Sequence, residues 1–406
     1  MRTAATLLLG GAVALCSPVL GASIGSESSI GLAADGNSNP FLVTSDAKAA
    51  ESAAFLANVP ITYTGDENTL DLIPRIRLAE THGDAQLLSN YQYLDADWRF
   101  INERNTLNAS GGWHRDSTFY NVFENGALNG HTSYRQEDLA NLSYARQLNE
   151  RDGFQLIGFY DSIRYDAAVG QTLASYEYVQ GAAEYDHQLG ERWQASLTGG
   201  YGAFRLIQEN YRSQQEFGQL GLNRSLTERW SLKAQLGYSW LQDRLVQPEL
   251  ICPVYYLYCY FGFVSYEHVQ VTSRSTGSSP NGQLTLERHY ERTTLDLAAA
   301  RSVVPSGLGA LVTQTDLKTT VNYQLSERWQ LSTTLHGAAL SNATAQSQIG
   351  NRRYANLDLS GNWQWTEHWL LQLSATGLVQ DIDRHYSHAL AFSIGAYRQF
   401  GRIRIR

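Results

Sequence analysis

The sequence predicts an all-β protein, a transmembrane antiparallel up-and-down β-barrel of about 18 strands. Three observations support this fold class. Apolar and polar residues alternate along runs of about ten residues, tryptophans stand beside the turns, and most successive turns are roughly forty residues apart. We expect short periplasmic turns and longer extracellular loops, as in bacterial barrels.

A short phrase made of a polar turn, a tryptophan and an alternating run recurs along the chain. It reads Glu-Arg-Trp at 191–193, 228–230 and 327–329, and Glu-His-Trp at 367–369. After Trp230, every second position is apolar: Leu232, Ala234, Leu236, Tyr238 and Trp240. A period of two predicts strands that have one apolar face.

The tryptophan positions distinguish a membrane barrel from a soluble sandwich or a large antiparallel sheet, which would show the same alternation. Aromatic residues collect where strands cross a membrane interface. Six tryptophans beside the turns form the expected aromatic girdle: Trp193, Trp230, Trp329, Trp363, Trp365 and Trp369. Trp240 lies one strand length beyond Trp230 and indicates a second girdle. Ordinary core tryptophans of a sandwich are the alternative.

Composition agrees with a membrane barrel. The 406 residues are 43% hydrophobic with a mean hydropathy of -0.33. After the N-terminus no apolar stretch approaches the ~18 residues of a membrane helix. A barrel reconciles a polar average with a membrane location, because only alternate residues meet lipid. The net charge of -8 argues against nucleic acid as a partner.

The termini indicate export to the outer membrane of a Gram-negative bacterium. Residues 1–22 have the pattern of a signal peptide, residues 23–55 form either a periplasmic linker or a first strand plus loop, and residues 56–406 form the barrel. Cys16 also suggests a lipoprotein, but Leu15 stands where a lipobox prefers a small residue. The stretch 392–400 approximates the aromatic terminal strand of proteins inserted by the barrel-assembly machinery, and the strand is expected to continue after a kink at Gly401.

The turns give the strand count. Eight periplasmic turns are expected near 65–68, 102–105, 149–152, 190–192, 227–229, 291–292, 326–328 and 366–368. The opposite connections are expected at 114–135, 161–175, 242–281 and 341–353. Seven hairpins between the turns and a final one make sixteen strands. A strand at 56–64 and a partner at 28–34 raise the count to eighteen, with sixteen remaining if the N-terminal part stays in the periplasm.

Charged residues are expected on one wall of the lumen. Strand parity turns six side chains inward from two neighbouring strands: Asp71, Arg75, Arg77, Asp95, Asp97 and Arg99. Facing charges set selectivity in pores, so this wall is a candidate filter. Mutual pairing that merely fills a polar interior is the alternative.

One outer connection is unusually aromatic. It holds Cys252 and Cys259, the only cysteines after the signal, which an oxidising compartment is expected to join in a disulfide. Five aromatic residues of this loop are the candidate lid: Tyr255, Tyr256, Tyr258, Tyr260 and Phe261. The loop could constrict the lumen or stack on sugars at its entrance. A strand extension with packed aromatics is the alternative.

Catalytic motifs are missing from the sequence. No Ser/His or Asp/His layout suits hydrolysis, the histidines are scattered, and no phosphate loop or metal-ligand cluster occurs. We therefore expect no enzymatic activity, no cofactor and no metal.

The export signal, the turn phrase, the segment Asn39-Pro40-Phe41 and the stretch 300–307 (Ala-Arg-Ser-Val-Val-Pro-Ser-Gly) together resemble the beta-barrel porin 2 (OmpL-like) family of Gram-negative bacteria. The resemblance covers most of the mature chain and rests on architectural motifs. It implies a porin. It also implies that similar barrels beside exopolysaccharide genes carry polymer outward.

These observations lead to one expected function and two alternatives. We expect an outer-membrane channel for small hydrophilic solutes, because a barrel of this size encloses a water-filled lumen. Export of exopolysaccharide and a structural or adhesive barrel with a plugged lumen are the alternatives. Expected partners are outer-membrane lipid and lipopolysaccharide, the barrel-assembly machinery and, for export, periplasmic polysaccharide-export proteins.

Overall fold

The computed structural model describes residues 23–83, 87–118, 133–166, 173–251, 267–344, 351–401 and 403–405. Among these residues no helix is long and apolar enough to cross a membrane. The elements are β1 (Ser23–Ser26), β2 (Ser29–Asn37), β3 (Ala50–Asn58), β4 (Ile61–Thr64), β5 (Asn68–Gly83), β6 (Tyr91–Ile101), β7 (Asn105–Ser117), β8 (Tyr134–Gln147), β9 (Asp152–Tyr165), β10 (Tyr176–Gly190), β11 (Trp193–Leu206), β12 (Tyr211–Thr227), β13 (Trp230–Ile251), β14 (Glu267–His289), β15 (Thr293–Ser306), β16 (Ala310–Gln324), β17 (Trp329–Asn342), β18 (Arg352–Thr366), β19 (Trp369–Ile382), β20 (His385–Gln399) and β21 (Ile403–Ile405).

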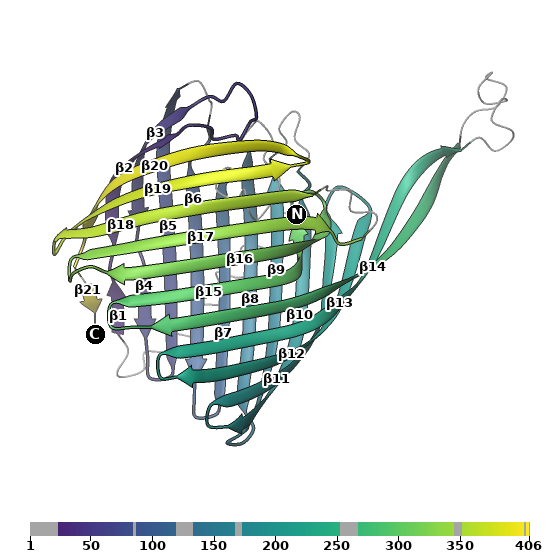
Figure 1. Cartoon of the computed structure of the whole chain (residues 1–406), viewed down its shortest axis with the longest axis horizontal. Helices are drawn as coiled ribbons and strands as arrows, with labels where there is room; N and C mark the ends of the chain where they lie inside the picture. Colours follow the sequence, from purple (N-terminus) through teal and green to yellow (C-terminus); the bar gives the residue numbers. More distant parts are fainter. Residues whose placement is uncertain are drawn as a thin grey trace.

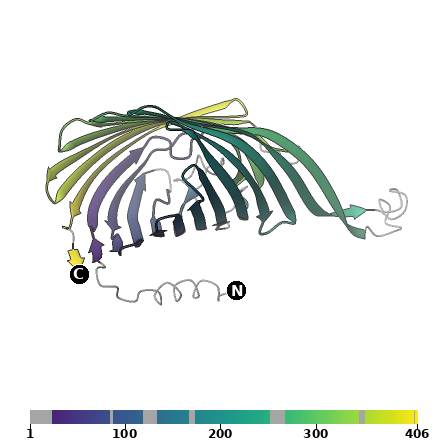
Figure 2. The same cartoon turned by 90° about the horizontal axis from the view of Figure 1, so that it is seen from below.

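The strands form one closed antiparallel barrel of eighteen strands (Figures 1 and 2). Three of these strands are each broken into two elements. β3 and β4 both pair with β5, and β1 and β2 together lie between β3 and β4 on one side and β20 and β21 on the other. Pairing of the N-terminal strand with the C-terminal strand closes the wall. The predicted count of eighteen is confirmed, and the count of sixteen is wrong.

Prolines account for one of the strand breaks. Pro60 separates β3 from β4, and Pro74 lies opposite the break on β5, where its carbonyl accepts a hydrogen bond from the Val59 nitrogen at 3.1 Å. A proline has no N–H for the ladder, so strands are interrupted where it occurs. The C-terminal strand also continues after Gly401 as predicted, because β21 pairs with β1.

The predicted short turns are confirmed, whereas one predicted loop is wrong. All eight turns fall between consecutive strands at the same end of the barrel. The connection predicted for 242–281 is largely strand, since β13 continues to Ile251 and β14 begins at Glu267. These two strands extend beyond the barrel as an arm (Figure 1). Polar residues such as Gln242, Arg244, Arg274 and Thr276 take outward positions here, so the segment resembles a loop in the sequence.

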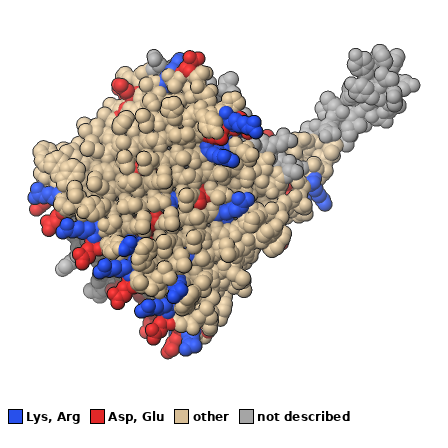
Figure 3. All heavy atoms as spheres, viewed as in Figure 1, with Lys and Arg blue, Asp and Glu red and all other residues tan. Residues whose placement is uncertain are grey.

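The outer face carries the apolar belt of a membrane barrel. Large exposed apolar side chains lie at mid-strand and face outward, among them Leu236 at 75%, Leu220 at 67% and Leu197 at 57% exposed. From Trp230 to Trp240 the belt is about 25 Å tall, the height expected of a transmembrane barrel. Figure 3 shows Lys, Arg, Asp and Glu lining the left and lower-left edge, where the turns lie, with fewer charged side chains on the wall beside it.

Candidate functional site: the lumen wall and the mouth

Register places the six predicted lumen residues on one face of β5 and β6. Paired residues of neighbouring strands share a face, and Arg75 pairs with Tyr93 while Asp71 pairs with Asp97. The intervening residues Leu78 and Leu94 are exposed on the outer face. By the alternation of strands, Asp71, Arg75, Arg77, Asp95, Asp97 and Arg99 therefore all face the lumen.

Most of these charges are already engaged. Nη2 of Arg75 lies 2.5 Å from Oδ2 of Asp95, and Asp71 accepts a hydrogen bond from the Thr62 hydroxyl at 2.5 Å. Arg77 is only 8% exposed; it pairs with Asp35 on β2 and donates to the Ser89 carbonyl at 3.1 Å.

Asp97 and Arg99 form no ion pair with any described residue. These two side chains are the part of the predicted set that remains open to the lumen.

A larger network continues from Asp95 onto β7 and β8. The His114 ring lies between two carboxylates, with Nε2 2.7 Å from Asp95 and Nδ1 2.9 Å from Glu137. Arg135 then bridges Glu137 at 3.2 Å and Asp116 at 2.8 Å. With the His114 ring protonated, the charges alternate in sign across four neighbouring strands.

We call this set of residues the wall network: Arg75, Asp95, His114, Glu137, Arg135 and Asp116.

The wall network is graded from buried to open. The side chains of Arg135 and Asp116 are 3% and 1% exposed, while that of Arg75 is 44% exposed. The hydroxyl of Tyr93 donates to Asp116 at 2.7 Å and further fixes the buried end. A charge held by several partners keeps its position, so the network presents a rigid wall with the Arg75 cation at its solvent-facing end.

Four members of this network were not predicted from the sequence. A loop was expected from His114 to Arg135, whereas β7 continues to Ser117 and β8 begins at Tyr134. The missed signal is the inward parity that Arg135 and Glu137 share, because register pairs Glu137 directly with His114. Beyond the apolar belt the outward residues are polar too, so alternation alone does not distinguish this strand from a polar loop.

The mouth, meaning the end of the barrel with the long connections, is crossed by a hairpin tip. The ladder between β14 and β15 ends at the pair Gly282 and Arg301. Pro280 and Pro305 flank this point, and each removes a donor from an edge that would otherwise continue the sheet. Beyond it the hairpin of β15 and β16 bends into the lumen, and the Gly307 carbonyl accepts a hydrogen bond of 2.8 Å from Ala174, which precedes β10.

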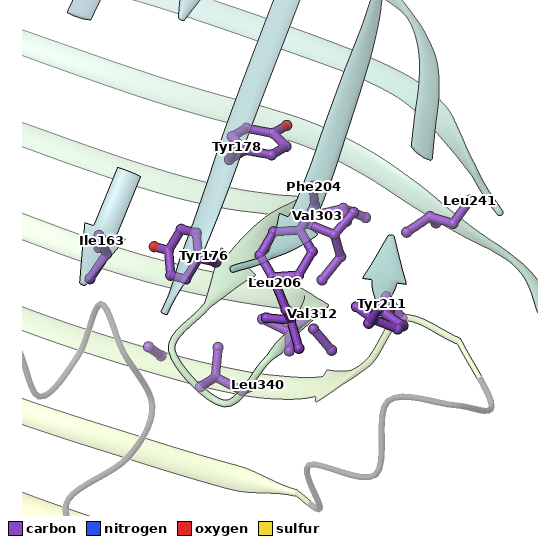
Figure 4. Close-up of a cluster of buried hydrophobic side chains, with 14 of the residues drawn as sticks. Ile163, Tyr176, Tyr178, Phe204, Leu206, Tyr211, Leu241, Val303, Val312 and Leu340 are labelled. Atoms are coloured by element: carbon purple, nitrogen blue, oxygen red, sulfur yellow. The ribbon is translucent and has the colours of Figure 1, made fainter. Parts of the chain in front are cut away.

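We call residues 303–312 the tip. Its apolar side chains Val303, Leu311 and Val312 are 6%, 1% and 1% exposed. They belong to one cluster with Phe204 and Tyr176, which face inward from β11 and β10 (Figure 4). The tip therefore reaches from β15 to β10 over the inner faces of the strands between them and narrows the mouth.

A second inward segment precedes β3. Leu42 is 3% exposed and belongs to the same buried cluster as the tip. Its carbonyl accepts a hydrogen bond from Gln380 at 3.2 Å. Asn39 fixes the turn, because its side chain accepts from the Val43 nitrogen at 3.1 Å and donates to the His388 carbonyl at 3.0 Å. Two segments far apart in sequence thus narrow the mouth together.

A buried carboxylate at the mouth links β12 and β13 to the residues that follow β17. Asp243 of β13 is 1% exposed, accepts from the Ser213 hydroxyl at 2.6 Å and also accepts from the Thr344 hydroxyl. The pKa of Tyr211, which lies above the apolar belt, is raised by burial and by the nearby negative charge of Asp243.

The predicted girdle tryptophans lie at the turn ends of β11, β13, β17, β18 and β19. The Arg224 guanidinium lies 4.1 Å from the Trp193 ring centre, and that of Arg288 lies 4.5 Å from Trp230. Trp329 stacks on its cross-strand partner Trp363 at 5.4 Å. Cation–π contacts and stacking hold the rings at this level.

Trp365 and Trp369 complete the set and are 55% and 39% exposed.

Several predicted features lie outside the described residues. These are the signal peptide at 1–22, the cysteine pair Cys252 and Cys259, and the lid residues Tyr255, Tyr256, Tyr258, Tyr260 and Phe261. Among the described residues no group of three or more His, Cys, Asp or Glu side chains is arranged to hold a metal ion.

The fold and the lumen define the class of the protein: it is a β-barrel of the outer-membrane type, with an apolar belt outside and a charged wall inside. No family model and no curated protein matches the chain.

Solved structures of outer-membrane barrels align with it at low identity. The ferric-catecholate import receptor Fiu from E. coli K12 has 9% identity and a TM-score of 0.48, over 95% of this chain and 82% of that chain. OccK5 (OpdH) of Pseudomonas aeruginosa has 12% identity and a TM-score of 0.45, over 93% and 98%. A BenF-like porin from Pseudomonas fluorescens Pf-5 has 10% identity and a TM-score of 0.47, over 92% and 99%. Because these TM-scores lie below 0.5, the assignment to the class rests on the geometry of the chain itself.

Proposed function

We propose that the protein is a channel that lets small hydrophilic solutes diffuse across the outer membrane of a Gram-negative bacterium, as a porin of the OmpL-like kind. The wall network carries the proposal. A purely structural barrel has no need of a graded series of fixed charges that ends in a half-exposed arginine, whereas a pore uses such charges to choose among ions. The signal at 1–22 and the barrel-assembly machinery would deliver the chain to that membrane.

The tip supplies the size limit in this proposal. Its apolar residues pack on inward side chains of β10 and β11, so the passage at the mouth is narrower than an eighteen-stranded wall alone would leave. Solutes would pass beside the tip and along the charged wall of β5 to β8. Asp97 and Arg99, which have no described ion-pair partner, would contact them further inside.

Polymer export is the second candidate, and one observation favours it. Inward residues in register across β17, β18, β19 and β20 are all serine: Ser332, Ser360, Ser374 and Ser393. The row continues to Asp35 and Ser52 on β2 and β3. Closely spaced hydroxyls can exchange hydrogen bonds with a sugar chain without holding it tightly. Exopolysaccharide would then follow this wall.

Solute flux into liposomes that contain the chain from Ser23 onward tests the proposal. The channel predicts swelling with monosaccharides, slower swelling with trisaccharides and none with long polymers. If no solute caused faster swelling than in empty liposomes, the protein would not be a channel. A structural or adhesive barrel with a plugged lumen would then be the better description. Rapid passage of long glucans would favour polymer export instead.

A further inference from the structure

Four arginines stand in one register row on the outside of the barrel. Arg205 of β11 pairs with Arg212 of β12, Arg212 pairs with Arg244 of β13, and Arg244 pairs with Arg274 of β14. All four side chains are exposed. They share the outward parity of Trp240, which is 54% exposed. We call these four residues the arginine row.

The row is unfavourable for the isolated barrel. Side chains directly opposite on neighbouring antiparallel strands have Cβ atoms about 5 Å apart, and like charges in such pairs are destabilising. Arg205 is compensated by Glu177, whose carboxylate lies 2.6 Å from its Nε. Arg212, Arg244 and Arg274 form no ion pair with any described residue. These three adjacent cations therefore have no ion-pair partner among the described residues, and an anion from outside the chain would neutralise them.

The outward residues below the arginine row indicate its level relative to the membrane. Moving from the barrel centre toward the mouth, the outward rows contain Leu220 and Leu236, then Tyr238 with two glycines, then Tyr201, Glu216 and Trp240, then two glutamines, and then the arginines. The step from the aromatic row to the arginine row is four residues, about 10 Å along the barrel axis at the tilt of such strands.

Hydrocarbon, interface and headgroup layers of a membrane follow in the same order.

We propose that the arginine row binds the phosphate groups of an anionic, phosphorylated glycolipid in the outer leaflet. Guanidinium groups bind phosphate oxygens in pairs, and their long side chains can bend toward the interface. The row spans about 14 Å from β11 to β14, enough for a headgroup that carries two phosphates. Lipid is favoured over a soluble phosphate compound because the tyrosine and tryptophan directly below would contact the glycolipid near its acyl chains.

The arginine row lies on the strands beside the split in the barrel wall. β14 loses its pairing with β15 beyond Gly282, so the strands that carry the row form the free side of the split at the mouth. A lipid bridging β11 to β14 would hold these strands together on the outside, in addition to the buried contacts of Asp243 on the inside.

A triple variant tests the site. R212Q/R244Q/R274Q removes the three uncompensated charges, and R151Q/R192Q/R328Q is the matched control, because those arginines are exposed in turns at the opposite end. Binding of diphosphoryl lipid A to the detergent-solubilised barrel is measured by native mass spectrometry. We expect the affinity to fall about tenfold or more in the first variant and to stay within about twofold in the control. Equal losses in both variants, or none in either, would overturn the proposal.

Two further measurements distinguish a lipid phosphate from a soluble phosphate compound. Dephosphorylated lipid A should bind the wild type as weakly as diphosphoryl lipid A binds the triple variant, and millimolar pyrophosphate should not displace the lipid. Displacement by pyrophosphate would show a site for soluble phosphate and contradict the lipid assignment. Arg212→Lys should keep part of the affinity, since the charge stays while paired hydrogen bonding is lost.

The outcome is independent of solute flux, because the arginine row faces away from the lumen.

Discussion

At the level of single residues, burial decides which charges of the lumen wall support the fold and which can meet a solute. Arg135 and Asp116 are almost fully buried and hold each other, so neither can respond to a passing ion. Arg75 is half-exposed and shares Asp95 with His114, so its charge reaches the lumen. The buried end of the network therefore supports the fold, and the exposed end can contact solutes. Substitutions at the two ends should accordingly change different properties, stability at one and ion preference at the other.

Replacement of Arg135 by Met should destabilise the barrel. Removing one partner of a buried pair leaves an uncompensated charge, which costs about 3–5 kcal/mol. The exposed pair of Arg164 with Asp138, at 3.5 Å, provides the control, and Arg164→Met should cost less than about 1 kcal/mol. Urea unfolding from lipid vesicles measures both, and equal values for the two variants would contradict the assignment of Arg135 to the buried end.

Replacement of Arg75 by Gln should shift ion preference toward cations. The change leaves the Asp95 carboxylate shared with His114 alone, and one unit charge in a partly screened lumen is worth roughly 0.5–1.4 kcal/mol. The ratio of cation to anion permeability should therefore rise by about twofold to tenfold, measured as a reversal potential in a salt gradient. Arg164→Gln, on the outer face, should leave the ratio unchanged. A change of the same size in the permeability ratio of both variants would mean that Arg75 does not contribute to ion selectivity.

Strand parity was enough to predict that six charged residues share a face, because alternation depends only on the strand itself. It could not predict their partners. His114 was recognised only as one scattered histidine, since its two carboxylates come from β6 and β8 through register that a single sequence does not encode.

At the level of elements, the tip shows how a hairpin leaves its sheet. Its strands are apolar on both faces around Gly307 and Gly309, unlike the alternating strands that separate lipid from water. Gly309 has a φ of 89°, a conformation that glycine adopts without strain, and this allows the tight turn. An element with two apolar faces is stable only when both are covered, so it folds into the mouth.

The tip should become mobile when its packing is removed. L311A/V312A deletes two side chains that are each 1% exposed, and the Leu311 change alone should cost about 2–5 kcal/mol of local packing. We expect larger and noisier single-channel currents and entry of larger sugars. Leu335→Ala, which removes a 51% exposed side chain from the lipid-facing surface of β17, is the control. Currents identical to wild type in the double variant would mean that the tip does not limit the passage.

The stretch 300–307 supported only a family resemblance, and the mostly apolar run from Val303 to Val312 did not enter the prediction. The arm likewise has the polarity of a loop in the sequence. In both cases the deciding factor is the neighbouring strand: β14 separates from β15 beside Pro280, and only the assembled sheet shows which strand loses its partner.

At the level of the whole molecule, closure depends on the two chain ends. The strand formed by β1 and β2 lies between the C-terminal strand and the strand formed by β3 and β4, so the barrel cannot close before the last residues arrive. The sequence predicted this architecture well, because turn spacing and alternation recur along the chain and tryptophans stand beside four of the eight turns. The interior was predicted less well, because the mouth brings together single residues from distant hairpins.

Single-channel recording in a planar bilayer tests the central claim most directly. We would compare the chain from Ser23 onward with its L311A/V312A variant. The proposed channel predicts steady, ion-selective openings in the wild type and larger openings in the variant. Absence of conductance in both, with the barrel shown to be folded and inserted, would contradict the claim that the lumen is a path for solutes.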